Sequence, residues 1–134
     1  MENKYISVLE ILMGRAKLEE LPKEYVENIN ILVTRVNSLL ELFFKDHPNE
    51  EKKTVSSGYR TPDINKSIPG SAKKSNHMTC SAVDLFDKNR TLSNWCVKNI
   101  KKLNELELYL EDPKYTPSWT HLQIKKTRNN PFIP

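Results

Sequence analysis

Four side chains in the second half of the sequence have the types that metal binding and acid–base catalysis need: His77, Asp84, Glu111 and His121. Three short segments around them alternate apolar and polar residues, which predicts strands: residues 81–86, 106–111 and 119–125. Side chains along a strand point alternately to its two faces. If the leucine and isoleucine side chains face a core, Asp84, Glu111 and His121 share the opposite face. His77 then lies on the loop just before the first strand.

Two imidazoles and one carboxylate form a common catalytic zinc set, which leaves a fourth position for a water whose pKa falls to about 7. A second carboxylate that is not a ligand is then wanted as general base. The four residues supply both parts. Each also has an ordinary alternative: a histidine beside a strand is more often a surface or core residue, Asp84 could hydrogen-bond at the end of a turn, and Glu111 could face solvent.

A second local pattern is the pair His77 and Cys80, in the spacing H-x-x-C. The pair could be half of a structural zinc site, or a Cys/His nucleophile pair. A structural zinc site needs four protein ligands, and the sequence has no second Cys/His pair. The remaining histidine, His47, lies at the expected C-terminal end of a long helix and is interpreted as a dipole or surface residue.

The elements that must position these residues follow from periodicity and turn residues. Apolar residues recur at helical spacing in two N-terminal segments, and Pro22 ends the first: residues 6–16 and 23–44. A charged turn, a strand, a long polar loop and a later helix are also predicted: residues 47–53, 54–60, 61–79 and 91–103. The turn-rich residues 112–118 indicate an antiparallel hairpin between the last two strands, and residues 127–134 an irregular tail. Helices followed by short strands around one helix predict an α+β fold with a small antiparallel sheet.

The chain has 134 residues, 37% of them hydrophobic, with 21 Lys and Arg against 17 Asp and Glu. This length fits a single domain over residues 1–134, with two helices in residues 1–46 and the sheet and metal loop in residues 54–125. The net charge of +4 is far below that of a dedicated nucleic-acid binder. No apolar run approaches the roughly 18 residues of a membrane span, and two cysteines cannot form a disulfide framework.

Three segments of the chain carry a family resemblance. Residues 75–84, SNHMTCSAVD, resemble the motif S-x-H-x-x-G-x-A-x-D of zinc D-Ala-D-Ala carboxypeptidases and related peptidoglycan peptidases, the peptidase M15 family. Residues 57–62, SGYRTP, resemble the S-G-Y-R-[ST]-P strand before the zinc loop of these enzymes, and residues 119–121, WTH, resemble their W-x-H motif. The three segments fall in the family's order and cover about residues 54–125.

The resemblance implies a hedgehog/DD-peptidase-like fold and a Zn²⁺ ion held by His77, Asp84 and His121. It implies hydrolysis of an amide bond in cell-wall peptides by a carboxypeptidase or endopeptidase. Arg60 would bind a substrate carboxylate or the developing oxyanion, since a guanidinium fork matches a carboxylate. The alternative for Arg60 is a surface salt bridge. The resemblance also suggests three substrate contacts: Ser75, Tyr59 and Trp119.

Two positions depart from the family pattern. The glycine of the first motif is Cys80 here, although glycine usually serves a tight backbone conformation. Many relatives carry the general base three positions before the last histidine ligand, and that position is Ser118 here. Other relatives have the base on the preceding strand, where Glu111 fits by parity. Asp112 is the alternative, because a shift of one residue exchanges the two faces of a strand.

Glu10 interrupts the only stretch that resembles a signal peptide, and no small-residue cleavage site follows it. We therefore expect synthesis in the cytoplasm without a secretory signal. Small members of the group without such a signal resemble bacteriophage endolysins or virion-associated lysins, which act on the cell wall. The expected partner is a peptidoglycan stem peptide, with no nucleic acid and no stable membrane insertion, and the chain is expected to be a monomer.

Two other functions stay open at this point. The departures at Cys80 and Ser118 are compatible with a catalytically degenerate relative that binds wall peptides or forms part of a virion. A thiol-dependent hydrolase would instead use Cys80 with His77. Metal content separates the zinc peptidase from the thiol hydrolase, and turnover of peptidoglycan separates it from the degenerate relative.

Overall fold

The computed structural model describes residues 4–134, which form helices around a small sheet. The helices are α1 (Val8–Leu12), α2 (Lys23–Asp46), α3 (Pro62–Ser67), α4 (Thr91–Lys98) and α5 (Ile100–Leu106). Short 3-10 turns are η1 (Leu18–Glu20), η2 (Asn76–Thr79) and η3 (Pro113–Tyr115). The strands are β1 (Val55–Ser57), β2 (Ala82–Phe86), β3 (Tyr109–Leu110) and β4 (Trp119–Gln123). Within these residues, no helix has the length and hydropathy that crossing a bilayer requires.

The four strands form one antiparallel sheet in the order β1-β2-β4-β3. In the β2–β4 pair, Asp84 lies opposite His121 and Val83 opposite Leu122. Neighbouring residues of a strand point to opposite faces, so the two polar residues share one face and the two apolar residues the other. The predicted α+β fold with a small antiparallel sheet is confirmed.

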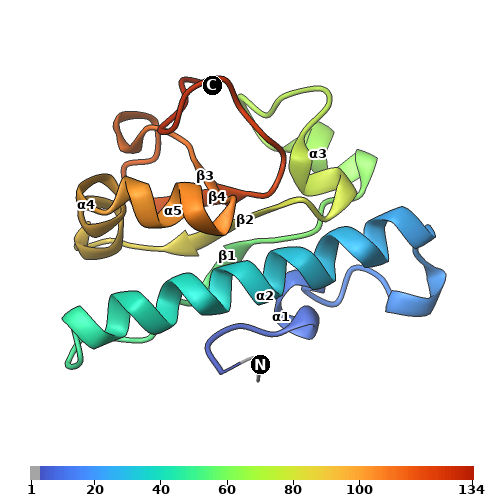
Figure 1. The fold of residues 1–134 in the computed structure, drawn as a ribbon. Helices are drawn as coiled ribbons and strands as arrows, with labels where there is room; N and C mark the ends of the chain where they lie inside the picture. Colours follow the sequence, from blue (N-terminus) through green and yellow to red (C-terminus); the bar gives the residue numbers. More distant parts are fainter. Residues whose placement is uncertain (1–3) are drawn as a thin grey trace.

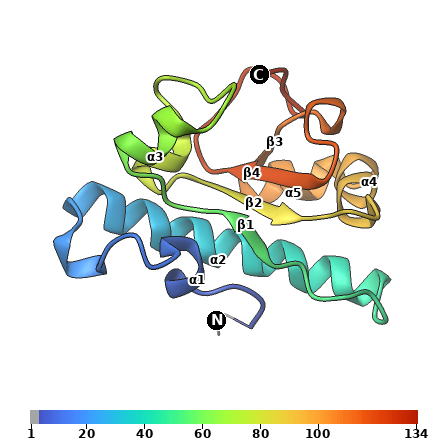
Figure 2. The same cartoon turned by 180° about the vertical axis from the view of Figure 1, so that it is seen from behind.

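One face of the sheet is covered by α2, which has a wide apolar stripe. Seven side chains of this stripe are almost fully buried: Ile29, Leu32, Val33, Val36, Leu39, Leu40 and Phe43. They pack in one core cluster with Val83, Leu85 and Leu122 of the sheet. In Figures 1 and 2, α1 and α2 lie on this side of the sheet, whereas the C-terminal tail and the segment around α3 lie on the other. The polar face of the sheet therefore points toward the C-terminal tail and the segment around α3.

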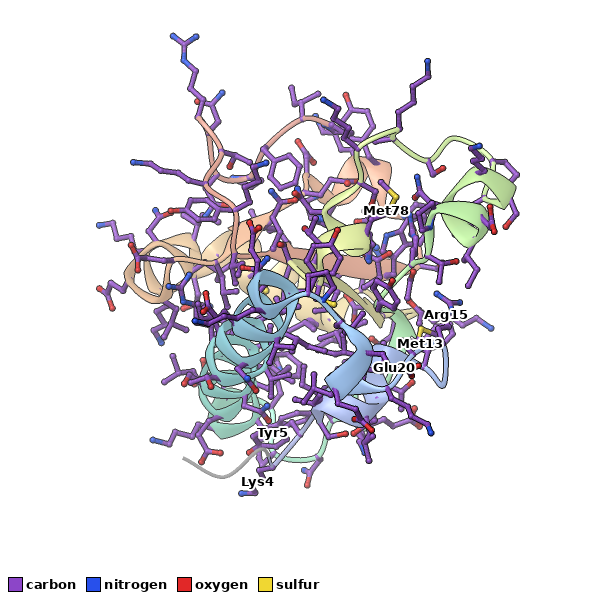
Figure 3. The ribbon with its side chains drawn as sticks, turned by 90° about the vertical axis from the view of Figure 1, so that its right-hand side faces the viewer. Lys4, Tyr5, Met13, Arg15, Glu20 and Met78 are labelled. Atoms are coloured by element: carbon purple, nitrogen blue, oxygen red, sulfur yellow. The ribbon has the colours of Figure 1, made fainter. Side chains whose placement is uncertain are left out.

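The segment around α1 holds the chain where it leaves β1. The Tyr59 backbone N–H donates to the Ile11 carbonyl at 2.8 Å, and the Arg15 guanidinium donates to the Tyr59 carbonyl at 2.7 Å. Figure 3 labels Arg15 and its neighbour Met13. A Cβ atom on Gly58 would lie 2.1 Å from the Ile11 carbonyl oxygen, so this close approach requires glycine. The N-terminal segment thus fixes the backbone that leads to Arg60.

Several predicted helices have different boundaries. The predicted helix over residues 6–16 is confined to α1, because Met13 and Gly14 both adopt positive φ angles and end it well before Pro22. The helix at residues 23–44 is present and extends to Asp46. The predicted helix over residues 91–103 is two helices divided at Asn99, and the second continues to Leu106.

The predicted strand over residues 106–111 was too long, since Glu107 adopts a φ of 55° that ends α5 and leaves only the short β3. The strand predicted over residues 54–60 is β1 alone. The predicted loop over residues 61–79 contains α3, which begins with Thr61 as its cap and Pro62 in its first turn. In the predicted irregular tail, Phe132 forms a parallel bridge with Glu111.

Candidate functional site

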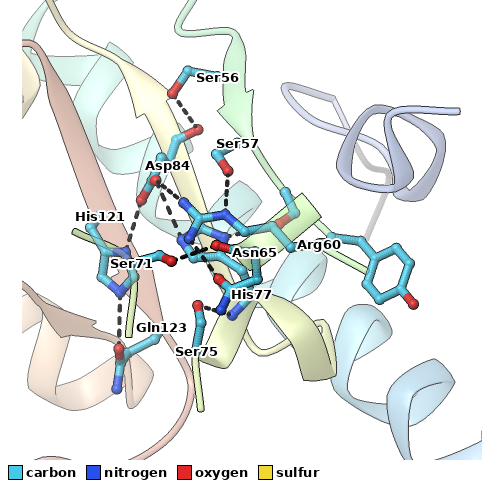
Figure 4. Close-up of polar contacts among 12 residues, drawn as sticks. Ser56, Ser57, Arg60, Asn65, Ser71, Ser75, His77, Asp84, His121 and Gln123 are labelled. Atoms are coloured by element: carbon cyan, nitrogen blue, oxygen red, sulfur yellow. Dashed lines mark hydrogen bonds and ion pairs between the residues drawn. The ribbon is translucent and has the colours of Figure 1, made fainter. Parts of the chain in front are cut away.

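Three segments far apart in sequence bring His77, Asp84 and His121 together on the polar face of the sheet. His77 belongs to η2, Asp84 to β2 and His121 to β4, and all three residues are buried. One candidate ligand atom from each lies within 4.8 Å of the other two. Nδ1 of His121 is 2.8 Å from Oδ1 of Asp84, and Nε2 of His77 is 3.3 Å from Oδ2. Dashed lines join Asp84 to both rings in Figure 4.

The loop before β2 presents His77 through a tight turn. Ser75 caps η2, with its hydroxyl oxygen accepting the His77 backbone N–H at 3.1 Å. At the other end, Cys80 adopts a φ of 60°, the left-handed region in which glycine is favoured. A glycine at this position of the family motif would adopt this conformation without strain, and Cys80 adopts it here. Ser75 braces the turn, while its side chain also borders the cavity described below.

The outward nitrogen of His77 reaches a backbone carbonyl. Its Nδ1 lies 2.9 Å from the carbonyl oxygen of Gly58, and a carbonyl can only accept a hydrogen bond. In the neutral ring, Nδ1 therefore carries the hydrogen and Nε2 presents its lone pair to Asp84. A histidine so fixed by a partner outside the centre is typical of metal ligands. Two ring nitrogens and one carboxylate suit zinc as a donor set, so these residues fit the metal that their types predict.

Charges around Asp84 keep its carboxylate ionised. Burial alone would raise the pKa of Asp84, but the close contacts of its oxygens with the His121 and His77 rings outweigh it and hold the pKa far below its usual value. Burial lowers the pKa of His77, and the contacts with Asp84 raise that of His121 in spite of its burial. The centre therefore contains a buried, ionised carboxylate beside two ring nitrogens, which is a donor set that favours a cation.

Arg60 lies beside this centre and is not at the surface, so the surface salt bridge is excluded. Its side chain is only 11% exposed, and a terminal nitrogen lies 3.7 Å from Oδ2 of Asp84. The guanidinium also donates to Ser57 Oγ at 3.1 Å and to Asn65 Oδ1 at 3.3 Å. The Asn65 amide in turn donates to the Ala72 carbonyl at 2.7 Å, which ties α3 to the following loop. These contacts orient a fixed positive charge at the centre.

A cavity of about 600 Å³ opens onto the centre, and Glu111 lies in its wall. Glu111 directly follows β3, and its backbone N–H donates to the carbonyl of His121 in β4, which continues the β3–β4 register and puts the two residues opposite one another. Asp112 instead turns away and accepts the Lys114 backbone N–H at 3.0 Å. Burial raises the pKa of Glu111, and the negative charge of Asp84 adds to this although His121 opposes it. Of the two acidic candidates, only Glu111 lines the cavity.

The other predicted site residues divide between cavity and core. Arg60, Ser75 and Trp119 line the cavity. The side chain of Tyr59 instead packs in the hydrophobic core, because the residue pairs through its backbone with the α1 segment. Cys80 is fully buried in the same core, and burial raises the pKa of its thiol to about 11. The nucleophile pair therefore lacks an accessible thiol, and no oxidation-sensitive thiol faces the cavity.

Sequence reasoning missed three residues of this site. Gln123 lies within hydrogen-bond distance of His121, and strand parity could have indicated it because the two are separated by one residue. Phe132 of the tail stands with its ring centroid 5.9 Å from that of His121, and no local pattern predicts this. Asn65, which orients Arg60, lies in α3, within the residues predicted to form a loop. Thr61 and Pro62 were the available signal for this helix.

The sheet with its buried two-histidine, one-carboxylate centre, and a further carboxylate in the adjoining cavity, defines a metallohydrolase type of site. A family model described as Peptidase M15 matches residues 18–123. The chain belongs to this peptidase family, and the predicted resemblance is confirmed. The match begins within η1 and so takes in α2 as well as the three motifs. Comparisons with curated proteins and with solved structures found no match.

Proposed function

We propose that this peptidase hydrolyses an amide bond in peptidoglycan stem peptides and depends on zinc for it. The observation that carries the proposal is the convergence of His77, Asp84 and His121 beside a cavity that also contains Glu111. Family membership supports the peptidase activity. The metal and the cell-wall substrate are our inference from the donor set and from the sequence motifs.

His77 and His121 would hold the zinc ion with Asp84. When bound, the ion supplies Lewis-acid chemistry, lowering the pKa of water and polarising the substrate carbonyl. The ionised state of Asp84 supports this assignment, because a metal ligand must be deprotonated. The rings are held from outside the centre, so little reorganisation is needed on binding.

Glu111 acts as the general base. It takes a proton from the attacking water and returns it to the leaving amine nitrogen as the C–N bond breaks. Its raised pKa suits this exchange, since an efficient base has a pKa closer to the working pH. Its position opposite His121 supports the role, and Ser118, which cannot act as a base, is outside the cavity.

Arg60 stabilises negative charge on the substrate. Its guanidinium is oriented by Ser57 and Asn65 and can bind either a carboxylate or the oxyanion that develops on the attacked carbonyl. Trp119 offers an aromatic wall and Ser75 a hydroxyl to the peptide. The cell wall is the proposed place of action, as for a phage-type lysin, and the net charge of +4 favours contact with anionic wall polymers.

The test compares Glu111→Gln with Asp112→Asn on purified peptidoglycan, with release of peptide fragments followed by mass spectrometry. Both changes replace a carboxylate by the amide of the same shape, but only Glu111 lines the cavity. We expect Glu111→Gln to bind zinc as the unchanged protein does and to lose cleavage by at least about 100-fold. Asp112→Asn should cleave normally, because its amide oxygen can still accept the Lys114 N–H.

Other outcomes of this experiment would show which part of the proposed function is wrong. Normal cleavage by Glu111→Gln together with loss in Asp112→Asn would move the base to Asp112 and leave the class intact. Zinc binding by the unchanged protein without release of any fragment would favour the degenerate wall-binding relative. Cleavage that persists after complete removal of metal would contradict the proposal as a whole.

A further inference from the structure

Gln123 is a buried polar residue of β4 that contacts His121 on the side of its ring away from Asp84. It lies two residues after His121 on the same strand face, and only 4% of its surface is exposed. Its Oε1 is 2.9 Å from Nε2 of His121, and its Nε2 donates to the Lys125 carbonyl at 3.0 Å. Figure 4 shows Gln123 on the side of the His121 ring away from Asp84. The amide thus connects the ring to the backbone beyond the strand.

The contact with the Lys125 carbonyl fixes the orientation of the Gln123 side-chain amide. In the opposite orientation, the amide oxygen of Gln123 would face this carbonyl oxygen, and two acceptors would stand about 3.0 Å apart. The amide NH₂ group must therefore point to Lys125, and Oε1 must point to His121. Because Oε1 can only accept, Nε2 of His121 carries the hydrogen in this contact.

A neutral imidazole has one hydrogen, so a hydrogen on Nε2 leaves Nδ1 with a free lone pair. Nδ1 is the atom that faces Asp84 at 2.8 Å, so we take it as the ligand atom that His121 would offer to a metal ion. If Gln123 did not accept from Nε2, the Asp84 carboxylate would compete for the hydrogen on Nδ1. That hydrogen would block the atom on which metal binding depends.

The two rings differ in what fixes them. His77 is held by the backbone carbonyl of Gly58, which remains whatever the side chains are. His121 is held by a side chain, so its tautomer is open to substitution. We propose that Gln123 is a positioning residue that keeps His121 in the tautomer with hydrogen on Nε2, and thereby keeps Nδ1 free to bind the metal ion. This inference rests on the metal centre of the proposed function.

The test measures zinc affinity by competition with a chromophoric chelator for the unchanged protein, Gln123→Leu and Gln123→Glu. Leucine keeps the bulk but has no acceptor, and we expect zinc affinity to fall by about 10- to 100-fold. Glutamate restores an acceptor for Nε2–H, and with its second oxygen turned away from the Lys125 carbonyl it should return the affinity to within about fivefold of the unchanged protein. Circular dichroism of the zinc-free variants checks that each is folded.

A second measurement needs no variant. Long-range ¹H–¹⁵N spectra of the zinc-loaded protein should show the His121 hydrogen on Nε2. A hydrogen on Nδ1, or equal zinc affinity for Gln123→Leu and the unchanged protein, would overturn the inference while leaving the zinc peptidase in place. Failure of the unchanged protein to bind zinc would overturn both the proposed function and the inference. If Gln123→Leu does not fold, the spectra and Gln123→Glu decide: for the latter, loss of affinity comparable to that expected for leucine would count against the inference.

Discussion

Asp84 joins the two histidines because each of its oxygen atoms faces a different ring. Oδ1 lies against Nδ1 of His121 and Oδ2 against Nε2 of His77. With the hydrogen of His77 on Nδ1 and that of His121 on Nε2, all four of these atoms are acceptors, so a cation between them would relieve their mutual repulsion. A divalent cation satisfies the three residues at once. The same residue-scale chemistry explains why a carboxylate can remain ionised although it is buried.

Cys80 adopts a left-handed backbone conformation at a position that the family motif gives to glycine, and we expect no chemical role for its thiol. Its thiol is fully buried in the core, and its pKa is raised to about 11, so the reactive thiolate is absent at neutral pH. We predict that Cys80→Ala cleaves peptidoglycan within about threefold of the unchanged protein. Alanine keeps a Cβ in the same backbone conformation and removes the thiol.

The measurement is the initial rate of fragment release at equal zinc occupancy. His77→Ala is the reference for an inactive site, since it removes a proposed ligand while leaving Cys80 in place. If Cys80→Ala were as inactive as His77→Ala although it binds zinc normally, the thiol would be required and the water-based mechanism would be wrong.

At the scale of elements, a buried ion pair ties the turn after α2 to the start of α4. Lys53 is 5% exposed, and its ammonium lies 3.1 Å from Oδ1 of Asp87, which is fully buried. Asp87 also accepts the backbone N–H groups of Leu92 and Ser93. It therefore caps α4, which the favoured contact of an anion with a helix N-terminus explains. This contact fixes the end of β2, three residues beyond Asp84.

Lys53→Met should lower the free energy of unfolding by about 3 kcal/mol, because it leaves a buried carboxylate without its cation. Lys52→Met is the matched control. Lys52 is exposed and lies 3.9 Å from Glu10, so its loss should cost less than about 1 kcal/mol. Urea denaturation at pH 7 measures both. Equal losses in the two variants would contradict a stabilising role for the buried pair.

The same pair predicts a pH dependence. Burial would raise the pKa of Asp87, but hydrogen bonds from Ser93, Lys53 and Leu92 outweigh it and hold the pKa below its ordinary value. A carboxylate with a depressed pKa contributes its full stability above the unfolded pKa, near 3.9, and loses it as the pH falls through the folded pKa. The difference between the unchanged protein and Lys53→Met should therefore shrink below about pH 4.

The sequence predicts those features of the strands and helices that depend on neighbouring residues in the chain. Strand alternation correctly put Asp84, Glu111 and His121 on one face, because parity is a property of each strand and survived the error in length at residues 106–111. The end of α1 at Met13 and the division at Asn99 were not predicted. Gly14 was an available signal for the end of α1, whereas asparagine at the division is not a strong helix breaker.

The contacts of the C-terminal tail could not be predicted from the sequence. Phe132 pairs with the backbone of both Leu110 and Asp112, and its ring reaches His121. These contacts join residues more than ten positions apart, and nothing in the sequence of the tail indicates them. The burial of Tyr59 likewise depends on the α1 segment, which lies outside the three motifs. Sequence motifs indicated the proposed ligands, whereas long-range packing determines which residues surround them.

At the scale of the molecule, the proposed metal ligands connect the loop before β2 with two strands that lie side by side in the sheet. The helices α1 and α2 support the other face and the backbone that leads to Arg60 (Figures 1 and 2). An ion that binds only the folded arrangement stabilises it by mass action, by about 2.7 kcal/mol at a free concentration of 100 times the dissociation constant. Metal binding at the proposed centre would therefore stabilise the fold.

The most direct measurement of the central claim is a zinc titration of the metal-free protein, by calorimetry, together with the same titration of Asp84→Asn. The variant keeps the shape of the side chain and removes its charge. We expect one zinc ion per unchanged chain and binding weaker by at least about 100-fold in Asp84→Asn. A chain that takes up no zinc, or an Asp84→Asn variant that binds it as tightly as the unchanged protein, would contradict the assignment of Asp84 and the two histidines as zinc ligands.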